Sequence, residues 1–207
     1  MVGMTVSLVM FISGVTLAMH SSDVGKGALS GDHIYTNPVL GMRINLPEHW
    51  EFFTPEMQSR FGLTPSPPRP ADPNCKGPFC NEDIDIAFIS VPGTRPIGTI
   101  FLAGWKLPKE YLTSKNRIPL LTLAKQMTLG SMEHSSLKPI SGLIPIRLGK
   151  APAYRLTALN PKSQSKVFGY VAETHDHIFL LTVTPYPMSK AADTLQQSIE
   201  SMALAYP

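Results

Sequence analysis

One short segment of the sequence, Glu173 to His177, gathers side chains that could bind a metal ion or transfer a proton. It reads Glu-Thr-His-Asp-His. If a β-strand ran through it, His175 and His177 would project from the same face, as ligands do in many metal sites. The segment lies between two strongly apolar runs, however, which is typical of a polar hairpin turn. We therefore interpret it as a turn and predict no metal site. His175 and His177 are the candidate ligands that it offers, and a third, such as His33 or His134, would have to come from elsewhere.

The other patterns of catalytic sites do not accompany this segment. The Gly130-Ser131 pair lacks the Gly-x-Ser-x-Gly sequence of a nucleophile elbow, and the chain has no glycine-rich phosphate loop. The pairs Glu48-His49 and Glu133-His134 each join a carboxylate to an imidazole, but neighbours on an extended chain point to opposite faces. The sequence therefore predicts no catalytic residue and no cofactor, and we expect that the protein is not an enzyme.

The chain has two cysteines, Cys75 and Cys80, in the sequence Asn-Cys-Lys-Gly-Pro-Phe-Cys-Asn. Four residues separate them, whereas the cysteines of a redox-active pair are separated by two. Gly77-Pro78 lets the chain fold back, so we predict a disulfide that stabilises this loop by about 2 kcal/mol in the chain-entropy model. Half of a metal site is the alternative interpretation, although the chain has no further cysteine to complete it.

The beginning of the chain has the pattern of an export signal. The first 18 residues carry no charged side chain, and Val6 to Ala18 is an apolar run. A membrane-spanning helix needs about 20 such residues, so this run fits the apolar part of a secretory signal. An uncleaved anchor and a misplaced start codon are the alternatives. With the cysteine pair, the run predicts a periplasmic or secreted protein. We divide the chain into a signal-like leader (1–18), a flexible linker (19–33) and a single domain (34–207).

Length and charge limit the class of protein further. A chain of 207 residues corresponds to about one domain. The net charge is +3, without any run of Lys or Arg. A nucleic-acid-binding protein concentrates its basic residues on one face or in one segment, so we expect no nucleic-acid partner. We expect contact with a membrane only through the leader.

The rest of the chain carries strand and helix patterns. Met42, Ile44 and Leu46 alternate with polar residues, as in a half-buried strand, and the nearby Trp50 should anchor the core. Further strands are predicted at 84–91, 97–105, 143–148, 153–159, 167–174 and 178–184, and helices at 54–62, at 119–129 and from about 189. The run 178–183 is apolar on both faces and should be central. Because short hairpins join most strands, we predict an α+β fold: an α-β-α sandwich with a mainly antiparallel central sheet covered by helices on both faces.

The opening stretch, Tyr35 to Trp50, reads YTNPVLGMRINLPEHW. It resembles the start of DcrB-like bacterial periplasmic proteins, which belong to the wider PsbP/Mog-like superfamily. Two later segments are similar to that group as well. They are the hairpin with Gly149, Ala153 and Arg155-Leu156, and the closing helix at Leu195 to Ile199. The resemblance spans about 34–205.

The resemblance implies a function without catalysis. Members of the superfamily are accessory or binding proteins, among them an extrinsic photosystem subunit, a Ran-binding factor and envelope lipoproteins. We therefore expect an exported module of the bacterial envelope, whose partner is a protein or another envelope component. The chain departs from the family pattern at Met42, where an aromatic residue is common, and in its cysteine loop. The alternative is a small metal-dependent envelope enzyme, or a metal-binding protein, that uses His175 and His177.

Overall fold

The computed structural model describes residues 27–31, 33–47, 49–54, 56–57, 82–90, 98–113, 115, 117–185 and 191–204, with the backbone alone at 82–90, 130–135 and 191–192. The predicted leader and the Cys75–Cys80 pair lie outside these residues. The elements, in chain order, are β1 (Ala28–Ser30), β2 (Ile34–Asn37), β3 (Met42–Asn45), β4 (Trp50–Phe52), β5 (Glu82–Ser90), β6 (Gly98–Lys106), α4 (Lys109–Thr113), α5 (Leu120–Ser135), β7 (Lys138–Pro139), β8 (Ile144–Leu148), β9 (Ala151–Leu159), β10 (Lys166–Glu173), β11 (His177–Pro185), α6 (Ala191–Glu200) and β12 (Ala203–Leu204).

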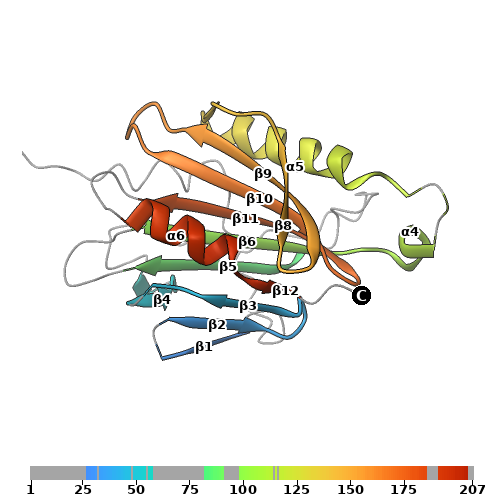
Figure 1. Cartoon of the computed structure of the whole chain (residues 1–207), viewed down its shortest axis with the longest axis horizontal. Helices are drawn as coiled ribbons and strands as arrows, with labels where there is room; N and C mark the ends of the chain where they lie inside the picture. Colours follow the sequence, from blue (N-terminus) through green and yellow to red (C-terminus); the bar gives the residue numbers. More distant parts are fainter. Residues whose placement is uncertain are drawn as a thin grey trace, which may run out of the picture.

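An eight-stranded sheet forms the centre of the molecule (Figure 1). Its strand order is β4-β5-β6-β11-β10-β9-β7, and β8 also pairs with β9. Every strand pair in it is antiparallel. The most apolar strand, β11, lies in the middle, and all of its residues except Thr182 are buried. The mainly antiparallel sheet and the central place of this strand are therefore confirmed.

A smaller sheet, in the order β1-β2-β3-β12, is built on the opening stretch. Four turn residues join β2 to β3, and Gly41 takes the left-handed φ of 57° that the turn requires. The buried Asn37 fixes this turn, because its Oδ1 accepts from the Leu40 N–H at 3.1 Å and its Nδ2 donates to the Tyr35 hydroxyl at 2.8 Å. β1 lies inside the segment 19–33 that we predicted to be a flexible linker. The three residues of this short strand pair with β2, so ordered structure begins before Ile34.

The two faces of the large sheet are covered differently. On one face, α5 packs Leu123, Ala124 and Met127 against Ile178 and Leu180 of β11 and their neighbours. The other face carries the larger core, to which the small sheet contributes most of the cover and α6 adds Leu195 and Ile199. Our prediction of helices on both faces was therefore too simple, because it did not include a second, smaller sheet. Alternate residues of β11 pack into the two cores, because successive side chains of a strand point to opposite faces.

Local predictions held at the ends of several elements. Trp50 is only 1% exposed, which confirms it as a core residue. The Met57 N–H lies 3.3 Å from Thr54 Oγ1, which caps the start of the helix that the sequence predicts at 54–62. The sequence predicts a helix that ends at 129, before Gly130, but α5 continues through this glycine to Ser135. A helix interior tolerates glycine at a cost of about 1 kcal/mol. The helix ends where Ser136 takes a left-handed φ of 55°.

Candidate functional site

The segment with the candidate metal ligands is a tight turn at one end of the large sheet. β10 ends at Glu173 and β11 begins at His177, and the Thr174 N–H donates to the His177 carbonyl at 2.8 Å. His175 is exposed at the tip, whereas His177 is 2% exposed and its Nδ1 lies 2.7 Å from Asp176 Oδ1. The turn is therefore confirmed, and the two imidazoles do not share one strand face.

No metal cluster appears among the residues that the structure describes. In those ranges, no group of three or more His, Cys, Asp or Glu side chains could hold a metal ion. Among the described side chains, His33 therefore does not complete a set of ligands with His175 and His177, and the side chain of His134 lies outside the described part of the chain.

The polar residues around this turn hold α4 and the loop after it against the sheet. Glu173 is buried and forms an ion pair with Arg117. The Arg117 guanidinium also lies 5.4 Å from the centre of the Tyr111 ring, which is within the range of a cation–π contact. The Tyr111 hydroxyl donates to the Ile118 carbonyl at 2.9 Å. The buried carboxylate of Glu173 at the end of β10 therefore has a structural role, because its ion pair holds the loop after α4 against the sheet.

A second polar cluster fastens α6 to the large sheet. Glu200 Oε1 accepts from Arg155 Nη1 at 2.5 Å, from Gln196 Nε2 at 2.9 Å and from the Tyr170 hydroxyl at 3.3 Å. Burial raises the pKa of Tyr170 far above its ordinary value, and the charge of Glu200 raises it further. The hydroxyl therefore stays protonated and donates at neutral pH. Sequence reasoning noted Arg155 only in a family motif and missed its partners, which are distant in the chain.

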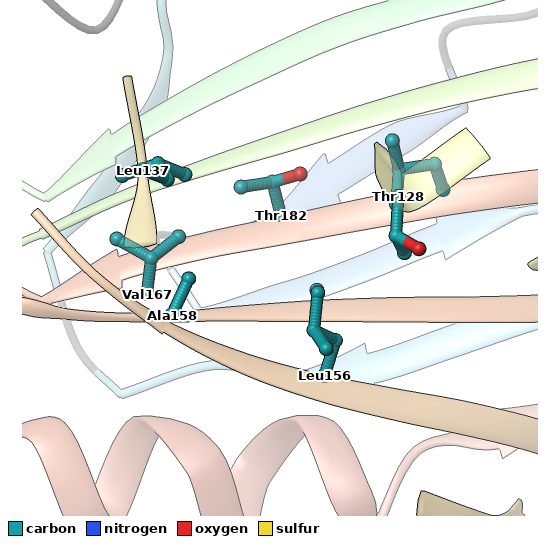
Figure 2. Close-up of a pocket in the computed structure, with 8 residues that line it drawn as sticks. Thr128, Leu137, Leu156, Ala158, Val167 and Thr182 are labelled. Carbon is teal, nitrogen blue, oxygen red and sulfur yellow. The ribbon is translucent and has the colours of Figure 1, made fainter. Parts of the chain in front are cut away.

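A pocket opens on the other face of the sheet, between the later part of α5 and strands β9, β10 and β11 (Figure 2). Its cavity volume is about 20 Å³, and the open depression around it measures about 300 Å³ when the adjoining solvent is included. Its lining consists of Thr128, Leu137, Leu156, Ala158, Val167, Gly169, Leu180 and Thr182. The side chains labelled in Figure 2 point into this space from both layers.

The chemistry of the pocket is apolar and uncharged. None of its lining residues is titratable, and the Thr128 hydroxyl is already used, since it donates to the Ala124 carbonyl at 2.6 Å. A Cβ added to Gly169 would meet no atom within 4 Å, so the floor of the pocket lacks a side chain. Such a site can accept an apolar group, but it offers nothing to polarise or protonate one. The sequence signal that could have revealed the pocket is the glycine inside an apolar strand. Such a glycine often marks a site where a ligand or another backbone approaches the strand closely.

No helix in the described ranges is long and apolar enough to cross a membrane.

Comparison with known proteins relates the chain to others by fold alone. No protein-family model matches it, and no curated protein is significantly similar. The solution structure of cyanobacterial PsbP (CyanoP) from Synechocystis sp. PCC 6803 superposes with a TM-score of 0.53 at 8% identity, over 86% of this chain and 98% of that one. A crystal structure from Bacteroides thetaiotaomicron VPI-5482 gives a TM-score of 0.46 at 10% identity, over 85% of this chain and 49% of that one, so this chain spans about half of that protein. The molecule thus has a PsbP-like fold.

Proposed function

We propose that this protein is a non-catalytic binding or accessory module, exported to the bacterial envelope and related there to the DcrB-like proteins. The observation that carries the proposal is the PsbP-like fold, which extends over nearly the whole cyanobacterial chain. The superfamily that the opening stretch resembles consists of accessory and binding proteins. A shared fold does not fix a function, so the site must supply the rest of the argument.

The polar residues of the two clusters already form ion pairs and hydrogen bonds with one another, which supports a role without catalysis. Catalytic groups must reach a substrate and one another in a shared cavity. Here Glu173 pairs with Arg117 under the α4 segment, and Glu200 joins Arg155 and Tyr170 beneath α6. Each of these groups links two elements of the fold.

The pocket beneath α5 is the place where we expect a partner to bind. Its uncharged lining favours an apolar side chain of a partner protein over a charged metabolite, since an unpaired charge would lose its hydration there. The end of that side chain would contact the half-buried Thr182 and the open space at Gly169.

Photo-crosslinking tests this binding role. A diazirine-bearing amino acid replaces Thr182 in one variant and the exposed His175 in a control, and both are irradiated in the native envelope fraction. We expect a discrete protein adduct from position 182 only. Gly169→Val, which fills the pocket, should abolish that adduct without unfolding the protein. Equal adducts from both positions, or an adduct that Gly169→Val leaves unchanged, would contradict binding at the pocket.

Thermal melting separates this proposal from a metal-dependent enzyme. We expect that zinc, copper and manganese leave the melting temperature unchanged. A site filled at 100 times its dissociation constant would add about 2.7 kcal/mol, which a melting curve detects easily. A rise that disappears in the His175→Ala, His177→Ala double variant would support the metal-dependent function instead.

Export is tested on material from the native host. N-terminal sequencing should show that Val6 to Ala18 has been removed, or the protein should remain with the membrane fraction. Thiol titration of the unfolded, unreduced protein should find Cys75 and Cys80 paired. A full-length soluble cytoplasmic form with two free thiols would overturn the export proposal.

A further inference from the structure

The segment from Lys138 to Leu148 runs along one edge of the large sheet. β7 pairs with the end of β9, where Lys138 lies opposite Leu159, and β8 pairs with its beginning, where Leu148 lies opposite Ala151. Between them, the amides of Ile140 and Ser141 both donate to the Thr157 carbonyl, at 2.9 and 3.2 Å. The segment therefore follows β9 from end to end (Figure 1). We call it the edge segment.

Positive charge is concentrated along and beside the edge segment. From Ser136 to Ala172 the chain has no acidic residue and six basic ones: Lys138, Arg147, Lys150, Arg155, Lys162 and Lys166. Because the whole chain has a net charge of +3, all other residues together carry −3. Arg155 is partly buried and paired with Glu200, whereas the other five side chains are exposed. The sequence appeared to scatter its basic residues, and the pairing of β7, β8, β9 and β10 gathers them on the strands and turns at one side of the large sheet.

The exposed cations stand at both ends of the edge segment. Lys138 and Lys166 lie opposite Leu159 from its two sides, so they share one face near the end of β9. Arg147 and Lys150 lie at the hairpin turn at the other end, where Arg147 Nη2 donates to the Lys150 carbonyl at 2.9 Å. A long strip with positive charge at each end results.

Two large apolar side chains are exposed between these ends. Ile140 is 53% exposed and Ile144 is 39% exposed. Apolar side chains flanked by lysines suit an anionic bilayer, where the cations meet lipid phosphates and the apolar groups enter the boundary of the acyl region. Nucleic acid would use the cations but not the isoleucines. Pro139 and Pro145 lack N–H groups, which weakens the edge as a template for an added peptide strand.

We propose that the edge segment, with Lys150 and Lys166, docks the folded domain onto an anionic membrane surface. This interaction is distinct from partner binding at the pocket and from any anchoring by the leader. Phosphatidylglycerol-type headgroups supply the negative charge, and Ile140 and Ile144 provide the apolar contact.

Sedimentation with vesicles tests the proposal on the full chain. Phosphatidylcholine vesicles are compared with vesicles that also contain phosphatidylglycerol, so that insertion of the apolar leader, which is insensitive to lipid charge, cancels. We expect binding to the anionic vesicles that weakens from about 0.1 M to about 1 M salt, as the screening length falls from about 10 to about 3 Å. The variant Lys138→Glu, Lys150→Glu, Lys166→Glu should bind at least on the order of a hundredfold more weakly, since each lost cation contributes about fivefold and the three new carboxylates add repulsion.

A matched triple variant isolates the edge from net charge. Lys109→Glu, Lys115→Glu, Lys125→Glu changes the charge equally at exposed positions on α4, the loop and α5. It should retain most of the binding, and Ile140→Ser, Ile144→Ser should reduce binding severalfold. Equal losses in both triple variants would overturn the proposal, because net charge alone would then explain the attraction. Failure of the wild type to bind anionic vesicles would also overturn it and would favour an acidic protein surface as the partner.

Discussion

At the scale of single residues, the two histidines that first drew attention have different structural roles. His177 begins the central strand and is almost fully buried beside Asp176, whereas His175 is exposed in the turn. The sequence predicts that both can be replaced at little cost, because both were assigned to an exposed turn. The structure corrects that expectation for His177.

We expect His177→Ala to lower the free energy of unfolding by about 1–3 kcal/mol, because it empties a buried position and removes a partner of Asp176. His175→Ala should change it by no more than about 0.5 kcal/mol. Urea denaturation of the two single variants measures the difference. Equal effects from both substitutions would show that the turn does not bury His177.

A second residue-scale prediction concerns Tyr170 at high pH. Burial and the neighbouring Glu200 raise its pKa in the folded protein above the ordinary tyrosine value of 10.0. Above that pH the unfolded chain loses the phenolic proton while the folded protein keeps it. The contribution to stability is therefore complete below about pH 10 and falls as the pH rises further.

Urea denaturation between pH 8 and pH 11 should show this fall, and Tyr170→Phe should make it shallower. Tyr154→Phe is the matched control, since Tyr154 is a half-buried tyrosine opposite Val171 on the neighbouring strand. The same fall in wild type and Tyr170→Phe would indicate that Tyr170 ionises freely in the folded state.

At the scale of elements, two glycines of the β8–β10 region have opposite roles. Gly169 lies inside β10 with open space where a side chain would stand. Gly149 turns the β8–β9 hairpin at a φ of +58°, and a Cβ there would lie 2.9 Å from the Leu204 amide nitrogen. The hairpin turn was predicted from the sequence, but its contact with the C-terminal strand β12 was not.

We expect Gly169→Ala to stabilise the protein by about 0.4–1 kcal/mol, because it restricts the unfolded chain without a clash. Gly149→Ala should destabilise it by more than that, because of the left-handed backbone and the close approach of β12. Thermal denaturation of both variants measures the contrast. Loss of stability in Gly169→Ala would mean that the space beside β10 is filled.

Most of the strands could be predicted because each carries its own pattern. The period of two marks β3, and the apolar run of β11 marks the centre of the sheet without reference to any other element. The short elements β1, β7, β12 and α4 have no such pattern. Two or three residues become a strand only when a partner strand lies beside them, and that partner is distant in sequence.

The sites were less predictable than the strands for the same reason. The pocket needs α5 together with three strands, and the cluster around Glu200 joins residues 45 positions apart. Single-sequence patterns report on neighbours in the chain and not on such distant contacts. The turn at Glu173 to His177 was predicted correctly because its signal is local.

At the scale of the whole molecule, the chain divides between a large sheet and a small one that closes over its second face. The small sheet is led by β1, which pairs residue by residue with β2, and Leu29 packs against the main core. The sequence predicts a domain that begins at Ile34. The structure instead makes β1 an edge strand of the cover over that core.

Two truncations test where the folded domain begins. A chain that starts at Gly27 keeps β1, and we expect it to unfold at the same urea concentration as the full chain. A chain that starts at Ile34 loses the partner of β2 and the apolar contact of Leu29, which on full burial contributes about 1.5–3 kcal/mol. Because Leu29 is only partly buried, we expect a loss at or below the lower end of that range. A substitution of Leu29 by Ser in the longer chain should reproduce part of this loss. Equal stability of the two truncated chains would show that β1 does not stabilise the domain and that the segment before Ile34 is a linker.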